Sequence, residues 1–290
     1  MTRTQATSIG AIASVLWALL ALLTTLAGDI PPFQLTAMAF GISGMLAVSR
    51  WIAKPARLAS LRQPARVWVV GVGGLFGYHF LYFTALQAAP PVEASLIAYL
   101  WPLLIVVFSS LLPGERLRWF HVAGALLGFA GAALIVTDGG TVSFQRQYSL
   151  GYVIALLAAF TWSGYSILSR RFAHVSTEVV SGFCLASAVL AALCHLTMES
   201  TVVPASWTQS GAVIGLGLGP VGLAFFAWDF GVKRGDIQVL GAASYSAPLF
   251  STLILLAVGL AEPSWVIAAA CLFITAGAVV ASKEMLTGQD

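Results

Sequence analysis

The chain has 290 residues, of which 59% are hydrophobic and only 9% are charged. Soluble domains carry roughly 25% charged residues, so this composition excludes an ordinary soluble protein. The formal net charge is only +3, and the basic residues lie in short loops, which fits a membrane surface and disfavours a nucleic-acid partner.

Ten apolar stretches follow one another along the chain, each of about 20 residues, a length that can cross a bilayer as a helix. The first five are predicted at residues 8–27, 32–52, 67–87, 91–112 and 118–137, and the next five at 150–169, 178–198, 209–230, 237–258 and 264–282. The first stretch is longer than the apolar part of a typical signal peptide, so we interpret it as the first span. The predicted fold is an all-α integral membrane protein with ten transmembrane helices.

The second half repeats features of the first half at an offset of 146 residues. Tyr99-x-x-Pro102 returns as Tyr245-x-x-Pro248, and several glycines and a tryptophan return at the same spacing. The two five-helix repeats are expected at residues 1–140 and 146–290. Because each repeat has an odd number of spans, the second is predicted to be inverted relative to the first, as in many transporters.

The distribution of basic residues predicts the orientation. If the amino terminus is cytoplasmic, thirteen of the fourteen Lys and Arg residues lie on the inner side, and only Arg146 lies outside. This satisfies the rule that positive charges concentrate on the inner side of the membrane. Both termini are therefore predicted to be cytoplasmic.

Three features together carry a resemblance to a known family. They are the two Tyr-x-x-Pro helices, the turn Pro113-Gly-Glu-Arg-Leu117 with a weaker echo at Ala261-Glu-Pro263, and the glycine-rich fifth and tenth helices. The whole chain resembles the drug/metabolite transporter superfamily of EamA type, and most of all the bacterial YddG-type exporters of aromatic and other neutral amino acids. The resemblance implies a multi-pass protein of the bacterial inner membrane. It also implies a central cavity lined by helices one to four and six to nine, with the last helix of each half outside.

Aromatic residues within the spans are predicted to line that cavity. A Tyr hydroxyl or Trp N–H in the middle of a membrane needs a polar partner that lipid cannot supply, so these side chains should point inward. Such a surface suits a neutral solute with an apolar or aromatic side chain; the alternative is that the rings simply fill the core. The predicted substrate-binding residues are Trp17, Tyr78, His79, Tyr82, Tyr99, Trp101, Trp162, Trp228 and Tyr245. Trp51, Trp68, Trp119, Trp207 and Trp265 lie near helix ends and are expected to anchor in the membrane interface.

Few charged residues fall inside the predicted spans. His79 could carry a coupling proton or donate to a substrate carboxylate, or it could be a neutral, internally bonded histidine. Asp229 is placed near Lys233 at a helix end, so no acidic residue is clearly central, and transport is expected to need no proton or sodium gradient. The lack of buried Lys or Arg argues against phosphate-bearing solutes.

Pro102 and Pro248 occupy matching positions inside the fourth and ninth spans. Each proline removes a backbone hydrogen bond and frees a carbonyl group, so a kink is predicted near the middle of the membrane. The kink is interpreted as either a hinge or a static bend.

The leading prediction is a transporter that exports neutral amino acids, or facilitates their passage, by alternating access. A transporter of another small metabolite or drug, and a receptor or scaffold, remain alternatives. An intramembrane enzyme is disfavoured, because the sequence has no H-E-x-x-H motif and no paired membrane aspartates. Cys184, Cys194 and Cys271 lack metal-ligand spacing, so neither a metal nor a cofactor is expected. The oligomeric state is left open, with a monomer as one option.

Overall fold

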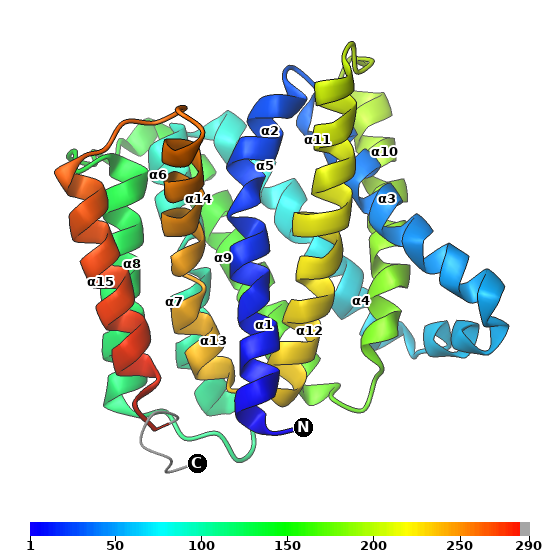
Figure 1. Ribbon diagram of the computed structural model, residues 1–290, viewed down its shortest axis with the longest axis horizontal. Coiled ribbons are helices and arrows are strands. Elements are labelled where there is room, and N and C mark those ends of the chain that lie inside the picture. The colour runs from blue at the N-terminus through cyan, green and yellow to red at the C-terminus, as the bar shows by residue number, and fades with distance from the viewer. Residues whose placement is uncertain (285–290) are drawn as a thin grey trace.

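The computed structural model describes residues 1–284, apart from the side chains of residues 47, 50 and 56, and within them it contains helices and no strands (Figure 1). In these residues, nine helical stretches are long and apolar enough to span a membrane, and a shorter apolar helix, Trp265–Ala281, is the tenth. The prediction of an all-α membrane protein with about ten helices is confirmed. The last residues of the predicted second repeat, 285–290, lie outside the described part of the chain.

The first half of the chain builds five spans. The first consists of α1 (Arg3–Trp17) and α2 (Leu19–Ala27), and the second is α3 (Pro32–Ala53), which is followed by the 3-10 helix η1 (Pro55–Leu61). The third span joins α4 (Ala65–Val72), the π-helix η2 (Gly73–Gly77) and α5 (Tyr78–Ala88). The fourth joins α6 (Pro91–Ala98), α7 (Trp101–Phe108) and η3 (Ser109–Leu111), and the fifth is α8 (Trp119–Thr137).

The second half builds another five spans. The short helix η4 (Arg146–Tyr148) leads into α9 (Ser149–Arg171), and η5 (Thr177–Val179) leads into α10 (Val180–Met198). The eighth span joins α11 (Trp207–Leu218), the π-helix η6 (Gly219–Leu223) and α12 (Ala224–Arg234). The ninth joins α13 (Ile237–Ala243) and α14 (Ser246–Ala257), and the tenth is α15 (Trp265–Ala281).

Irregular backbone occurs at matching places in the two halves. The π-helices Gly73–Gly77 and Gly219–Leu223 are related by the offset of 146 residues seen in the sequence. The fourth span is interrupted between Ala98 and Trp101, and the ninth between Ala243 and Ser246. Each interruption lies about one turn before its proline, because the proline ring cannot donate to the carbonyl four residues earlier. Whether Pro102 and Pro248 act as hinges stays a prediction.

Helices of the first half pack against helices of the second half. Their most extensive helix contacts pair one element from each half: α8 with α15, α3 with α10, α1 with α12, and α5 with α9. The beginning of α1 and the end of α15 lie at the same end of the bundle, which we call the terminal face (Figure 1). The pair α8 and α15 stands at one edge of the bundle.

Close backbone contact explains the glycines of the fifth and tenth helices. A Cβ atom added to Gly124 would lie 2.5 Å from the carbonyl oxygen of Gly277, and one added to Gly277 would lie 2.6 Å from the carbonyl oxygen of Gly124. Only glycine allows this approach, as in small-residue packing of other membrane helices. The α8–α15 pair is therefore built for packing.

Two details of the sequence interpretation are wrong. The sequence was expected to contain no buried Lys or Arg, but Lys233, in the last turn of α12, is buried together with Asp229. Trp51 was expected to anchor in the interface, but its side chain is only 9% exposed. By contrast, Trp119, Trp207 and Trp265 are all more than 70% exposed, as anchors in an interface would be.

Candidate functional site

Four tryptophans meet at the centre of the bundle. We call Trp17, Trp101, Trp162 and Trp228 the tryptophan cluster; they come from α1, α7, α9 and α12. Every pair of their rings has a centroid separation between 5.3 and 6.3 Å. Most pairs meet edge to face, the geometry in which aromatic rings attract one another. Two rings come from each half of the chain, so the cluster lies where the two halves join.

Not every indole N–H of the tryptophan cluster has a hydrogen-bond acceptor among the described residues. The Nε1–H of Trp228 donates to Ser166 Oγ at 3.1 Å. The Nε1 of Trp162 is buried and has no hydrogen-bond partner among the described residues. A buried N–H without a partner costs free energy, so it marks a place where a solute or water can bind.

A second group of rings on α5 extends the site from Trp162. The ring of Tyr78 lies 5.5 Å from that of Trp162 and 5.9 Å from that of Tyr82, which it parallels. The hydroxyl of Tyr82 is 3.0 Å from Ser95 Oγ on α6. Tyr99, where α6 ends, lies one turn after Ser95, and its backbone N–H donates to the carbonyl oxygen of Ser95 at 2.8 Å. Five predicted site residues, Trp17, Tyr78, His79, Tyr82 and Tyr99, are only half-buried, whereas Trp162 and Trp228 are fully buried.

His79 sits beside this group and makes an internal hydrogen bond. Its Nδ1 is 2.7 Å from the carbonyl oxygen of Leu75. A carbonyl oxygen only accepts, so Nδ1 must carry the proton, and Nε2 is the nitrogen that a solute could use. The imidazole also contacts Phe40 and Tyr78, with ring centroids 5.3 and 5.5 Å away.

The structure does not bring Tyr245 to the tryptophan cluster. Its side chain is fully buried in a separate apolar cluster with residues of α8, α7 and α15. Its hydroxyl accepts a hydrogen bond from the backbone N–H of Leu103, 3.2 Å away, and its ring lies 6.0 Å from that of Phe129. Substrate contact by Tyr245 stays a prediction, and the structure gives this residue a packing role.

Charged residues tie the two halves together at the terminal face. We call Arg3, Glu115, Arg170 and Asp236 the ion network. Arg3 lies 2.8 Å from Glu115 and 3.1 Å from Asp236, and Glu115 also pairs with Arg170. Arg170 donates as well to the carbonyl oxygens of Val232 and Gly235, at the end of α12. The network therefore links the start of α1 and the loop after the fourth span to the ends of α9 and α12.

The fold agrees with a comparison against family models. The model of the EamA-like transporter family matches residues 6–137 and again residues 149–283, five spans each time. The chain belongs to the EamA-like transporter family. The resemblance inferred from the Tyr-x-x-Pro helices is thereby confirmed.

Two relatives and one solved structure show how similar this EamA-type protein is to known proteins. It is 54% identical to the aromatic amino acid exporter YddG of Ancylobacter novellus, over 97% of this chain and 98% of the relative. It is 26% identical to the aromatic amino acid exporter YddG of Salmonella typhimurium, over 87% and 88% of the two chains. A crystal structure with 53% sequence identity superposes with a TM-score of 0.92 over 97% of both chains.

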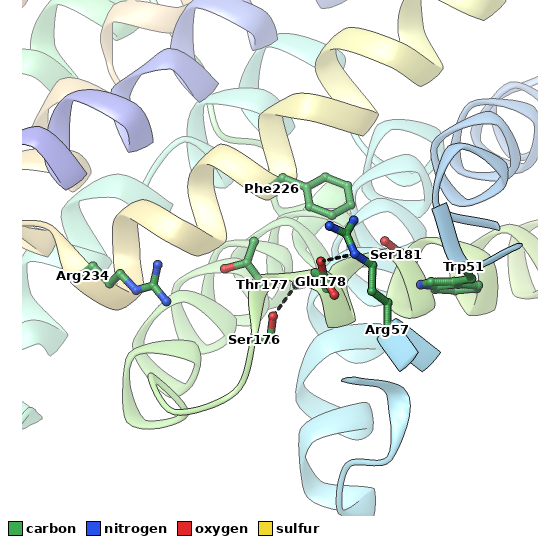
Figure 2. Close-up of a pocket in the computed structure, with 8 residues that line it drawn as sticks. All are labelled: Trp51, Arg57, Ser176, Thr177, Glu178, Ser181, Phe226 and Arg234. Atoms are coloured by element: carbon green, nitrogen blue, oxygen red, sulfur yellow. Dashed lines mark hydrogen bonds and ion pairs between the residues drawn. The ribbon is translucent and has the colours of Figure 1, made fainter. Parts of the chain in front are cut away.

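A cavity of about 170 Å³ opens beside the eighth span of the EamA-type bundle (Figure 2). Its lining shares no residue with the tryptophan cluster and consists of Trp51, Arg57, Ser176, Thr177, Glu178, Ser181, Phe226 and Arg234. Figure 2 shows Arg57 turned toward Glu178, with its Nε 3.4 Å from Oε1. Both side chains are more than a third exposed, so this ion pair adds little stability.

Sequence reasoning missed several residues of the site. Phe40 and Phe225 stack 5.7 Å apart, and Phe225 also contacts Trp17 and Trp162. A phenylalanine has no polar group that must avoid lipid, so its sequence position alone does not predict which way it faces. Tyr165, whose place within the sixth span predicts that it points inward but which was not among the predicted substrate-binding residues, packs 5.2 Å from Trp162.

Proposed function

We propose that the protein exports neutral amino acids, above all those with aromatic or other apolar side chains, and that it acts as a transporter and not as an enzyme. The observation that carries this proposal is the tryptophan cluster, in which both halves supply rings to one central site. Edge-to-face and stacked ring contacts contribute about 0.5–1.5 kcal/mol each, so such a site favours aromatic solutes over small polar ones. The names of the two relatives, both aromatic amino acid exporters, support this substrate class.

Alternating access would follow from the arrangement of the two halves. The ion network closes the terminal face, while the half-buried Tyr78, Tyr82 and Tyr99 border the rest of the site. Opening the terminal face would require Glu115 to separate from Arg3 and Arg170. The matched π-helices and the interrupted fourth and ninth spans are the places where the backbone can adjust, since non-helical backbone is tolerated where it is buried in protein or lines a cavity.

We place the protein in the bacterial inner membrane with the terminal face in the cytoplasm. Thirteen of the fourteen Lys and Arg residues lie in the loops and helix ends on the side of this face, and the positive-inside rule supports this orientation. The ion network would then be a cytoplasmic closure, and the conformation described here would be closed toward the cytoplasm.

We further propose that transport runs down the solute gradient. The tryptophan cluster itself carries no charge, and a zwitterion crosses the membrane without the electrical cost of about 2.3 kcal/mol per 100 mV that a net charge meets. His79 is the candidate proton carrier among the half-buried site residues. Its hydrogen bond to the carbonyl oxygen of Leu75 supports a structural role instead. We expect the His79→Ala variant to take up phenylalanine as fast as the wild-type protein, with and without an uncoupler.

Solute flux into liposomes tests the proposed function. Purified protein is reconstituted into vesicles preloaded with unlabelled phenylalanine, and the entry of labelled phenylalanine is followed. We expect competition by tryptophan, tyrosine and methionine, weaker competition by aspartate and lysine, and no competition by sugar phosphates. Flux equal to that of protein-free vesicles would refute transport, and equal competition by all solutes would refute the substrate class.

A further inference from the structure

A buried ion pair lies near the end of the eighth span, next to Trp228 of the tryptophan cluster. Asp229 and Lys233 are one turn apart on α12, and Lys233 Nζ is 2.8 Å from Asp229 Oδ2. The two side chains are 1% and 4% exposed, respectively. Burying two charges is costly, and a pair of well-packed apolar residues is often at least as stable. The fold alone therefore gives no reason for this pair.

The hydrogen-bonding capacity of the pair is largely unused. Neither carboxylate oxygen of Asp229 accepts a hydrogen bond of good geometry from residues 1–284, despite the short distance to Lys233. Lys233 donates to the carbonyl oxygen of Val175, 3.0 Å away. Oδ2 faces the Lys233 ammonium group, and Oδ1 accepts from no donor among the described residues, so the carboxylate has accepting capacity left for a ligand.

The pair is continuous with the aromatic site and with the interface between the two halves. Asp229 directly follows Trp228 on α12, and α12 packs against α9, where the ring of Tyr165 lies 5.2 Å from that of Trp162. A narrow cavity of about 10 Å³ adjoins the pair, with Val67 and Gly71 of the first half on its other side. A ligand whose ring occupies the tryptophan cluster could therefore reach the pair with groups at its other end.

The ion network also contacts the segment of α12 that carries the ion pair. Arg170 donates to the carbonyl oxygens of Val232 and Gly235, on either side of Lys233, at 3.1 and 2.7 Å. Breaking the bonds between Arg170 and its partners would free the segment that carries the pair. A solute arriving from the terminal face would then meet the pair beside the aromatic rings.

We propose that Asp229 and Lys233 form the binding site for the charged groups of a zwitterionic amino acid. The carboxylate of Asp229 takes the α-ammonium group of the solute, and Lys233 takes its α-carboxylate. The solute separates the two side chains, so one ion contact is lost and two are formed, with no change in net charge. Amines without a carboxylate and acids without an ammonium group leave one protein charge buried and unpaired, and the site rejects them. This inference rests on the proposed function and adds the means by which the site selects its substrate class.

Three ligands with one ring system test the inference: phenylalanine, phenethylamine and 3-phenylpropionate. Equilibrium dialysis with purified protein measures the affinity of each labelled ligand without requiring transport. We expect the wild-type protein to bind phenylalanine alone. Asp229→Asn and Lys233→Met should each weaken phenylalanine binding by about 30-fold, the loss expected for one partner of a buried charge pair.

The two substitutions should change selectivity in opposite directions. Asp229→Asn leaves Lys233 available, so 3-phenylpropionate should bind, whereas Lys233→Met leaves Asp229 available, so phenethylamine should bind. Asp229→Glu and Lys233→Arg should keep the wild-type order of ligands. Arg57→Gln combined with Glu178→Gln removes the exposed ion pair near the same face and should change none of the three affinities.

The outcomes separate this inference from the proposed function. If the wild-type protein binds none of the three ligands, the proposed function fails and the inference falls with it. If the wild-type protein binds phenylalanine but the two variants weaken this binding without gaining either single-charge ligand, or do not weaken it at all, the pair is structural and the inference alone is overturned. If neither Asp229→Asn nor Lys233→Met can be purified, the conservative variants Asp229→Glu and Lys233→Arg provide the test. Loss of the preference for phenylalanine in both of them contradicts the inference.

Discussion

Glu115 and Arg170 form an ion pair that joins the first half of the chain to the second at the terminal face. The carboxylate of Glu115 is only 6% exposed and also binds Arg3, 2.8 Å away. It therefore holds together three segments: the start of α1, the loop after the fourth span, and the end of α9. Opening this face must break both contacts, which makes Glu115 the residue on which closure depends most.

Removing the carboxylate should open the terminal face. Glu115→Gln deletes charge-assisted bonds worth about 2 kcal/mol, which corresponds to a shift of roughly 30-fold toward the open state. A cysteine at Ser14, a buried position one turn before Trp17, reports this change in a background without the native cysteines. We expect faster labelling of Ser14→Cys with a maleimide applied from the terminal face. The control is Glu178→Gln, in an exposed pair, and equal labelling rates in both variants would show that Glu115 does not hold the face closed.

Tyr245 allows packing to be separated from substrate contact. Tyr245→Phe keeps the ring but leaves the N–H of Leu103 without its acceptor, so we expect a loss of about 1 kcal/mol in stability. The measurement is the midpoint of thermal unfolding in detergent, together with the ranking of competing amino acids in the flux assay. A lower midpoint with unchanged ranking is expected. Altered ranking at an unchanged midpoint would instead support the substrate contact predicted from the repeat.

The glycine contact between α8 and α15 should be sensitive to a single methyl group. Gly124→Ala places a Cβ atom 2.5 Å from the carbonyl oxygen of Gly277, so the two helices must move apart. We expect a lower unfolding midpoint and less folded protein in the membrane. Gly211→Ala is the matched control, because a Cβ there meets no atom within 4 Å. Similar midpoints for the two variants would mean that close approach of these helices adds nothing to stability.

The assigned orientation can be tested directly in cells. Single cysteines placed in the loop at residues 138–148 should react with a membrane-impermeant maleimide applied from outside. Cysteines at residues 54–62 should be protected until the membrane is permeabilised. The opposite pattern would place the terminal face outside and reverse the assignment of the ion network.

The sequence predicted the architecture well because bilayer thickness sets the length of a span and duplication leaves an offset. It could not reveal the direction of every side chain. The repeat suggested that Tyr245 would share a site with Tyr99, but the ninth span is interrupted at Ser244, and α14 starts in an orientation that turns this ring toward α8 and α7. Spacing along the chain does not determine how a helix rotates after such a break.

The two π-helices and the buried ion pair were missed for related reasons. A π-helix in Gly73–Gly77 arises from packing across the bundle, where the side chain of Tyr165 lies against Gly74. Asp229 and Lys233 were assigned to a helix end because charged residues usually mark the limit of a span. Only the helices packed around it, α1, α4, α9 and α10, show that this turn of α12 is enclosed.

The most direct test of the account is the effect of Trp17→Ala on phenylalanine affinity. Trp17 contacts the other three rings of the cluster and is half-buried, so its loss leaves a smaller void than the loss of Trp162 or Trp228. We expect a weakening of about fivefold or more, with retained folding, because at least one ring contact of about 1 kcal/mol is removed. Trp119→Ala, at an exposed position on α8, should bind phenylalanine as tightly as the wild-type protein. If Trp17→Ala binds phenylalanine with wild-type affinity, the tryptophan cluster only fills the core, and the solute site lies elsewhere.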